Sequence, residues 1–182
     1  MLRCAQFITC LLHSIGPVTK ALEGCRLEGL EMDQIANLLS SLDCAGPASE
    51  DSVSEAEARL GLLFPPSYRQ FLLSYGAALG EGIEVFGLDM RLESGEMPQW
   101  SDVVEATLSL RPDCLPGDSI QISHDGMDNG FFLHCSKSNA DYEGPVIAWG
   151  PDHDAGVRVA KSFHEWLLAS ARPSNQGPAN AD

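Results

Sequence analysis

The chain has 182 residues, of which 26 are acidic and 11 are basic, so its formal net charge is −15. With 44% hydrophobic and 20% charged residues, its composition is globular and argues against disordered, collagen-like and low-complexity chains. The acidic balance disfavours nucleic acids and anionic membranes as partners, because both attract basic surfaces. It permits a basic protein partner.

The cysteines and the start of the chain bear on the cellular compartment. None of the six cysteines belongs to a Cys-x-x-Cys pair, so metal-binding spacing is absent and reduced thiols are expected: Cys4, Cys10, Cys25, Cys44, Cys114 and Cys135. The apolar run over residues 7–12 is far shorter than the roughly 20 residues of a transmembrane helix. Arg3 before this run leaves an export signal as an alternative, but no clear cleavage site follows. We expect a cytoplasmic protein.

The first 45 residues carry two helical patterns. Apolar side chains fall loosely on one face over residues 2–15. A clearer stripe with i, i+3, i+4, i+7 spacing occupies residues 32–43, and Gly46-Pro47 ends it. We predict an N-terminal helical extension over 1–45, a main domain over 46–172 and a flexible tail over 173–182.

Two helices are predicted at the start of the main domain. Ser52 and Glu55 match the S-x-x-E capping box, which indicates a short helix that ends at Gly61. A second helix is expected to begin near Pro66 and to end at Gly76. Its buried stripe would be Tyr68, Phe71, Leu72 and Tyr75.

Short strands and turns follow. We predict a strand over 83–88, a helix over 102–110 capped by Asp102, and a half-buried strand over 120–123. The turn dipeptides Asp125-Gly126 and Asn129-Gly130 predict a hairpin into residues 131–133.

The end of the domain is predicted to contain one more strand and one more helix. The strand covers residues 146–149 and precedes a polar loop over 150–156. A second capping box, Ser162 with Glu165, begins the closing helix. Helices first, then hairpin-linked strands, then a helix predict a single α+β domain with a twisted, mainly antiparallel sheet flanked by helices.

Residues 54–72, SEAEARLGLLFPPSYRQFL, resemble the opening signature of the SUKH superfamily, the cell-wall-assembly-regulator-like domains. Later segments match in the same order: Leu115-Pro116 before a strand, residues 122–126 as a strand with an Asp-Gly turn, Pro145-Val146, and residues 159–167 as the closing helix. The resemblance covers about residues 46–170. Residues 75–82 depart from it, because the family has an Asn-Gly-Gly-like turn there.

This resemblance implies a binding module without catalytic activity. Bacterial members of the immunity type bind and block a toxin domain, commonly a nuclease or deaminase, delivered by another cell. Other members act as regulatory scaffolds for a partner of the same cell, and this alternative shares the fold. The resemblance identifies neither the toxin nor the oligomeric state.

Charge distribution suggests where a partner would bind. Residues 81–154 contain fifteen acidic and three basic side chains, a net −12 out of −15. Acidic loops attract a basic partner such as a nuclease domain. The predicted partner-binding residues are Glu81, Glu84, Trp100, Asp125, Asp128, Asp152 and Asp154. The alternatives are that the acidic residues only keep the protein soluble and that Trp100 covers a small satellite core.

A third hypothesis is a metal-dependent hydrolase that uses His124 and Asp125. An Asp-Gly turn explains Asp125 without a metal, and Asp152 and Asp154 lack the remainder of a calcium-binding loop. The chain also has no G-x-S-x-G elbow and no phosphate-binding glycine motif. We therefore predict no catalytic residue, metal or cofactor.

Overall fold

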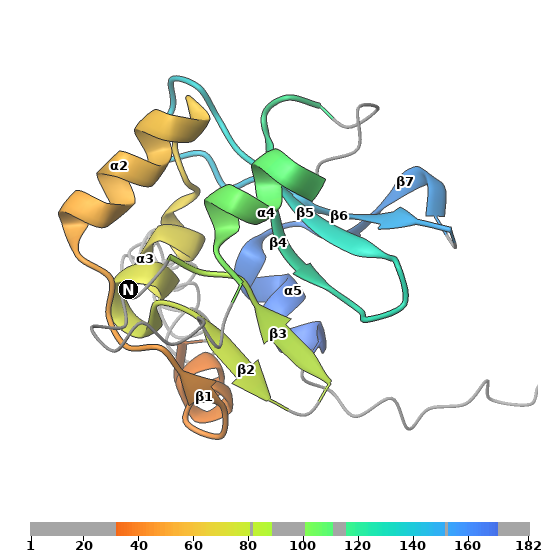
Figure 1. Ribbon diagram of the computed structural model, residues 1–182. Coiled ribbons are helices and arrows are strands. Elements are labelled where there is room, and N and C mark those ends of the chain that lie inside the picture. Colours follow the sequence, from red (N-terminus) through yellow and green to blue (C-terminus); the bar gives the residue numbers. More distant parts are fainter. Residues whose placement is uncertain (1–31, 81, 89–100, 111–115, 152, 171–182) are drawn as a thin grey trace, which may run out of the picture. The chain divides into compact units, whose positions relative to one another are not determined.

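The computed structural model describes residues 32–170 except 81, 89–100, 111–115 and 152 (Figure 1). By their internal contacts, residues 1–37 and 38–182 separate into two compact units. Residues 32–39 are helical, whereas the pattern predicted over 2–15 lies outside the described residues. No described helix combines the length and the apolar character needed to cross a membrane.

The second unit is an α+β fold whose named strands all pair antiparallel. Its elements are β1 (Asp43–Cys44), α2 (Glu50–Leu60), α3 (Pro66–Tyr75), β2 (Ala78–Gly80), β3 (Ile83–Val85), α4 (Val103–Leu110), β4 (Ser119–His124), β5 (Gly130–His134), β6 (Val146–Gly150), β7 (His153–Ala160) and α5 (Phe163–Ser170). The predicted class is confirmed, and the strands form two sheets, ordered β1-β2-β3 and β4-β5-β6-β7.

The two sheets are joined where β3 leaves the smaller one. The backbone N–H of Phe86 donates to the carbonyl of Ile122 at 2.8 Å. The hydroxyl of Ser123 donates to the carbonyl of Glu84 at 2.6 Å. These bonds attach β3 to β4 and make the β4–β5 hairpin a neighbour of the small sheet.

The start of α2 corrects one sequence prediction. Ser49, not Ser52, is the N-cap, and its hydroxyl accepts from the backbone N–H of Ser52 at 3.0 Å. The predicted Ser52–Glu55 capping box is therefore wrong. Ala48 and Val53, both buried, flank this cap as a hydrophobic staple, and their burial favours Ser49 over Ser52 as the cap.

The other helix boundaries follow their local signals. Gly61 ends α2 with a left-handed φ of 66°, and α3 begins at Pro66 and ends at Gly76, as predicted. Asp102 caps α4 by accepting from the N–H groups of Val104 and Glu105, each at 2.9 Å. The second capping box is also present. The hydroxyl of Ser162 accepts from Glu165 N–H at 3.2 Å, while the Glu165 carboxylate accepts from Lys161 N–H at 2.6 Å.

Two strand predictions are wrong. β4 is not half-buried, because Gln121 and Ser123 are 5% and 2% exposed. Helix α4 reaches this strand, where Thr107 Oγ1 accepts from Gln121 N–H at 2.9 Å. The predicted polar loop over 150–156 is largely strand, since β7 begins at His153 and pairs with β6. Pairing across the hairpin supplies the backbone partners that the local sequence does not indicate.

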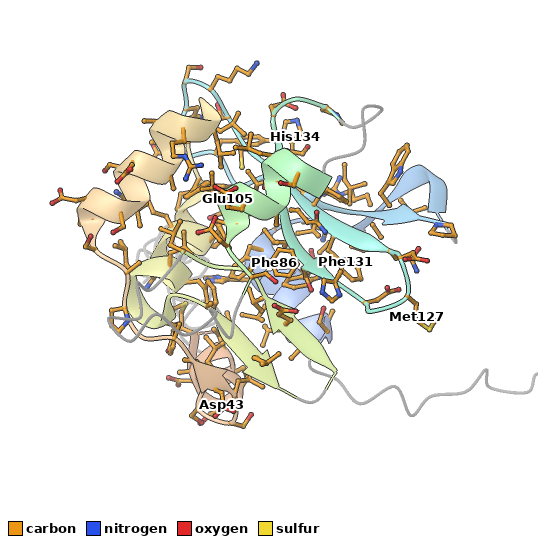
Figure 2. The ribbon with its side chains drawn as sticks, in the orientation of Figure 1. Asp43, Phe86, Glu105, Met127, Phe131 and His134 are labelled. Atoms are coloured by element: carbon orange, nitrogen blue, oxygen red, sulfur yellow. The ribbon has the colours of Figure 1, made fainter. Side chains whose placement is uncertain are left out.

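The centre of the fold is an aromatic cluster around Tyr68. Its ring is fully buried and contacts Phe163 and Phe64 with centroid separations of 5.0 and 5.5 Å. The Tyr68 hydroxyl donates to the carbonyl of Phe86 at 2.7 Å, so the one polar atom of this side chain is satisfied. Figure 2 shows Phe86 inside the molecule, whereas Met127, 72% exposed, projects at the tip of the β4–β5 hairpin.

Candidate functional site

The turn of the β4–β5 hairpin is held rigid by Asp125. One of its carboxylate oxygens accepts from the N–H groups of Met127 at 2.7 Å and Asn129 at 3.1 Å, and the other accepts from Asn129 Nδ2 at 2.6 Å. Partial burial acts to raise the pKa of Asp125, but these bonds outweigh it and hold the pKa below its usual value. Asp128 follows in the left-handed region with φ 74° and is exposed.

His124 and Glu84 connect this turn to β3. His124 Nδ1 accepts from Gly126 N–H at 3.0 Å, and His124 Nε2 lies 3.3 Å from Glu84 Oε2. The bond from Gly126 requires an unprotonated Nδ1, so the contacts fit the neutral tautomer that donates from Nε2. Glu84 also accepts from the backbone N–H and the hydroxyl of Ser101, at 3.2 and 2.8 Å. Its carboxylate therefore has a structural role at the junction of the sheets.

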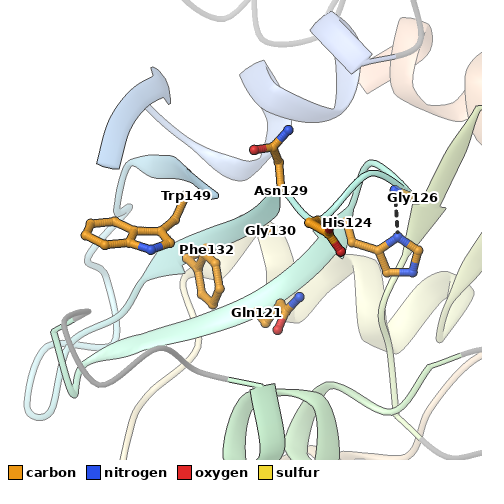
Figure 3. A pocket seen from close by; sticks show the side chains of 8 residues that line it. Gln121, His124, Gly126, Asn129, Gly130, Phe132 and Trp149 are labelled. Atoms are coloured by element: carbon orange, nitrogen blue, oxygen red, sulfur yellow. Dashed lines mark hydrogen bonds between the residues drawn. The ribbon is translucent and has the colours of Figure 1, made fainter. Parts of the chain in front are cut away.

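A hollow of about 400 Å³ lies on the face of β4, β5 and β6 beside this turn (Figure 3). Gln121 is paired with Phe132, and Gly130 with Trp149, so these positions share one face of the sheet. In Figure 3 the rings of Trp149 and Phe132 lie at one end and His124 at the other. The residues that line the hollow are Gln121, His124, Gly126, Asp128, Asn129, Gly130, Phe132 and Trp149.

Two glycines make room for the aromatic rings. A Cβ atom on Gly130 would lie 2.6 Å from the Phe132 ring. A Cβ atom on Gly156, whose φ is 71°, would lie 2.7 Å from the Trp149 ring. The indole therefore rests on bare backbone of β7 and stays half-buried at the edge of the hollow.

Gln121 is the unusual polar group of the hollow. Its side-chain Nε2 donates to the carbonyl of Ser123 over a long 3.4 Å, and its Oε1 is buried without a hydrogen-bond donor among the described residues. Leaving a buried acceptor unsatisfied costs about 1–3 kcal/mol. Such a cost in a hollow calls for a physical explanation.

The structure gathers part of the predicted partner-binding set. Glu84, Asp125 and Asp128 lie around the β4–β5 hairpin, and only Asp128 of the three leaves its carboxylate exposed without a hydrogen bond in the described part of the chain. The backbone of Asp154 lies in β7. Glu81, Trp100 and Asp152 lie outside the described residues.

Sequence reasoning missed Gln121 and Trp149. The alternation of Gln121 with Ile120 and Ile122 predicts a solvent-facing side chain, whereas the structure buries it beside the hollow. Trp149 ends an apolar strand and was assigned no role. The observed pairing of residue 121 with residue 132 brings them to one face, and no local pattern fixes that register, which shifts between Gln121 and Ser123.

The hydrolase hypothesis needs a metal held by side chains near His124 and Asp125. Among the described residues no three His, Cys, Asp or Glu side chains gather as a metal site. His124 and Asp125 are neighbours in sequence, but each is bonded to a different set of groups. Of the six cysteines, Cys44 and Cys135 are described; Cys44 is a free thiol, and the thiol of Cys135 donates to the carbonyl of Leu133 at 3.7 Å. Burial, and then the charge of Asp43, raise the pKa of Cys44.

These features define the class of the protein: an antiparallel α+β domain with an acidic hairpin. Residues 32–171 match the family model SUKH_5, described as SMI1-KNR4 cell-wall. Because this match covers most of the chain, the protein belongs to the SUKH family, as the sequence signature indicated.

Two individual proteins show the likeness further. A protein of Pseudomonas syringae pv. tomato known from its crystal structure superposes with a TM-score of 0.54 at 18% identity, covering 74% of this chain and 93% of that one. At that identity the likeness concerns the fold. The uncharacterized protein YnaB of Bacillus subtilis (strain 168) is 35% identical over 57 residues, which are 31% of this chain and 40% of YnaB. The match thus spans less than half of that relative.

Proposed function

We propose that this chain is a cytoplasmic immunity protein that binds and neutralises a toxin domain, and we expect a basic nuclease domain. The observation that carries the proposal is membership of the SUKH family over residues 32–171. The net charge of −15 supports a basic partner, since opposite charges accelerate association.

The β4–β5 hairpin is the proposed centre of the binding surface. Its turn is fixed by the bonds to Asp125, so little conformational freedom is lost on binding. It presents Met127, 72% exposed, beside the exposed carboxylate of Asp128. Methionine is enriched at protein interfaces relative to the rest of the surface, so an exposed Met127 beside a carboxylate fits the proposed surface. The other predicted residues, Glu81, Trp100, Asp152 and Asp154, remain part of the proposal.

The direct test is co-expression with any toxin-like C-terminal domain that is encoded beside this gene. We expect growth rescue and a complex that survives purification at low ionic strength. A toxic neighbour that is neither rescued nor bound would contradict the immunity function.

A matched pair of charge reversals tests the surface. Asp128→Lys and Asp141→Lys change the net charge equally, and both positions are exposed, but Asp141 lies in the β5–β6 loop. We expect Asp128→Lys to lower the association rate at least tenfold and Asp141→Lys to lower it less than twofold. Equal effects would mean that only net charge matters.

A regulatory scaffold that binds a partner of the same cell is the second candidate. The description of the matching family model, SMI1-KNR4 cell-wall, favours it. Rescue from the adjacent toxin separates the two functions, because a scaffold has no reason to protect against that toxin.

A further inference from the structure

We propose that the hollow between Gln121 and Trp149 binds an arginine side chain of the protein partner. This inference rests on the proposed function, because it identifies the chemistry by which a basic partner would be recognised. It is argued from the unsatisfied oxygen of Gln121, the ring of Trp149 and the charge of Asp128.

The first argument is the missing hydrogen-bond donor. Gln121 is 5% exposed, its Oε1 lacks a donor among the described residues, and its residue lines the hollow. The amide is weakly held, because its only described bond is the 3.4 Å contact from Nε2 to Ser123. The terminal torsion of glutamine is soft, so the amide can turn its oxygen towards a donor that enters the hollow. A guanidinium group brings five N–H donors and no acceptor.

The second argument is the aromatic end of the hollow. Trp149 is half-buried and seated on Gly156, so its ring is already positioned before a ligand arrives. A planar cation stacks on such a ring, and tryptophan is the best aromatic partner for it. The volume of about 400 Å³ lies near the lower end of the roughly 300–1,000 Å³ of small-ligand sites. That is ample for a guanidinium group with part of its aliphatic stem.

The charge of the residues that line the hollow also favours a cation. Asp128 lines the hollow with an exposed carboxylate, whereas Asp125 is occupied by Met127 and Asn129. No lysine or arginine lines the hollow among the described residues. A cation that enters is therefore attracted by Asp128 without a competing positive group in the lining. Lysine fits less well, because a compact ammonium neither stacks flat on indole nor spans two acceptors.

The experiment titrates the full chain with acetyl-Gly-Arg-Gly-amide at low ionic strength. The matching citrulline peptide has nearly the same shape as the arginine peptide but no charge. The lysine peptide has the charge but no planar guanidinium group. NMR follows the indole Nε1–H signal of Trp149, which Trp149→Phe assigns. We expect a saturable shift with arginine and at least fivefold weaker binding of the other two peptides.

Variants locate the site. We expect Gln121→Met and Asp128→Asn each to weaken arginine binding three- to tenfold, and the exposed control Asp141→Asn to leave it unchanged. Trp149→Leu should abolish binding, and a native-like amide spectrum shows whether that variant folds. The proposal is overturned if the citrulline peptide binds as tightly as arginine, or if arginine leaves the Trp149 signal unmoved. It is also overturned if Gln121→Met binds like the wild type.

The same variants separate this inference from the immunity function. If the toxin domain binds Gln121→Met and Trp149→Leu with wild-type affinity, the hollow is not the arginine site and the immunity function stands. If the arginine peptide binds but the toxin does not, the hollow recognises arginine in another partner and the proposed function fails.

Discussion

The Tyr68 cluster and the Trp149 hollow are both aromatic, but the polar atoms of Tyr68 and Gln121 differ in hydrogen bonding. Tyr68 is fully buried, and its hydroxyl is bonded to the Phe86 carbonyl at 2.7 Å. In the hollow, Gln121 keeps an oxygen without a donor in the described structure and Trp149 stays half-exposed. The cluster also has an unpaired polar atom, because the indole Nε1 of Trp166 beside Phe163 is buried without a partner among the described residues. The hollow differs in that its unpaired atom belongs to a residue that lines open space.

This contrast also explains what the family likeness conveys. The signature residues Tyr68, Phe71 and Phe163 all lie in the aromatic cluster. They specify how α3 and α5 pack, and therefore the fold. Surface groups such as Asp128, by contrast, can vary without disturbing that packing, so the family likeness does not determine a partner.

The largest expected effect comes from removing the centre of the cluster. Phe163 is completely buried against Tyr68, Phe71 and Trp166. We expect Phe163→Ala to lower the free energy of unfolding by about 3–5 kcal/mol, measured by urea denaturation. Met127→Ala, at an exposed apolar position, is the control and should change it by less than about 0.5 kcal/mol. Equal losses of stability would mean that Phe163 stabilises the fold no more than an exposed side chain does.

A smaller loss is expected from Tyr68→Phe. The ring contacts remain, but the buried carbonyl of Phe86 loses the 2.7 Å bond from the tyrosine hydroxyl. The free energy of unfolding should fall by about 1–3 kcal/mol. A change near zero would show that this carbonyl finds another donor.

The difference in stability between the wild type and Tyr68→Phe should also depend on pH. Burial raises the pKa of Tyr68 well above the ordinary tyrosine value of about 10, with smaller contributions from Cys135 and Asp102. Above about pH 10 the unfolded chain therefore releases a proton that the folded chain retains, so stability falls as the pH rises. The stability advantage of the wild type over Tyr68→Phe should be full below pH 10 and shrink above it. Parallel pH profiles of the two proteins would contradict this.

Substitutions of Glu84 test whether this predicted binding residue instead stabilises the fold. Glu84→Ala removes the acceptor of both Ser101 bonds and the contact to His124, so we expect a loss of about 1–2 kcal/mol in unfolding free energy. Glu84→Gln keeps an oxygen for Ser101 and should lose less than half as much. If the alanine variant is as stable as the wild type, Glu84 is free to serve a partner instead.

The parts of the fold that sequence predicted are those fixed by neighbours in the chain. Gly61, Pro66 and Ser162 set helix boundaries through their own backbone geometry or hydrogen bonds. The choice of Ser49 over Ser52 as a cap depended on Ala48 and Val53, whose burial is a tertiary fact.

The missed features depend on distant parts of the chain. Residues 153–156 are strand because β6 lies beside them, and α4 approaches the strand at Gln121, where Thr107 accepts from the backbone N–H. The candidate hollow combines three strands, so no local pattern could indicate it. The exposure of Asp128 could be predicted from charge and turn position, because an acidic turn residue needs no distant neighbour to be exposed.

The smallest effect on stability and the sharpest effect on function are expected from one variant, Asp128→Asn. Asparagine tolerates the left-handed φ of 74°, and the carboxylate that it replaces is exposed, so the free energy of unfolding should change by less than about 0.5 kcal/mol. Association with the toxin domain should slow and become less sensitive to salt, because the variant removes one of the charges that attract a basic surface. Stopped-flow association at several salt concentrations measures both. If both the association rates and the stability are unchanged, the hairpin is not part of the interface. Its acidic residues then serve solubility alone.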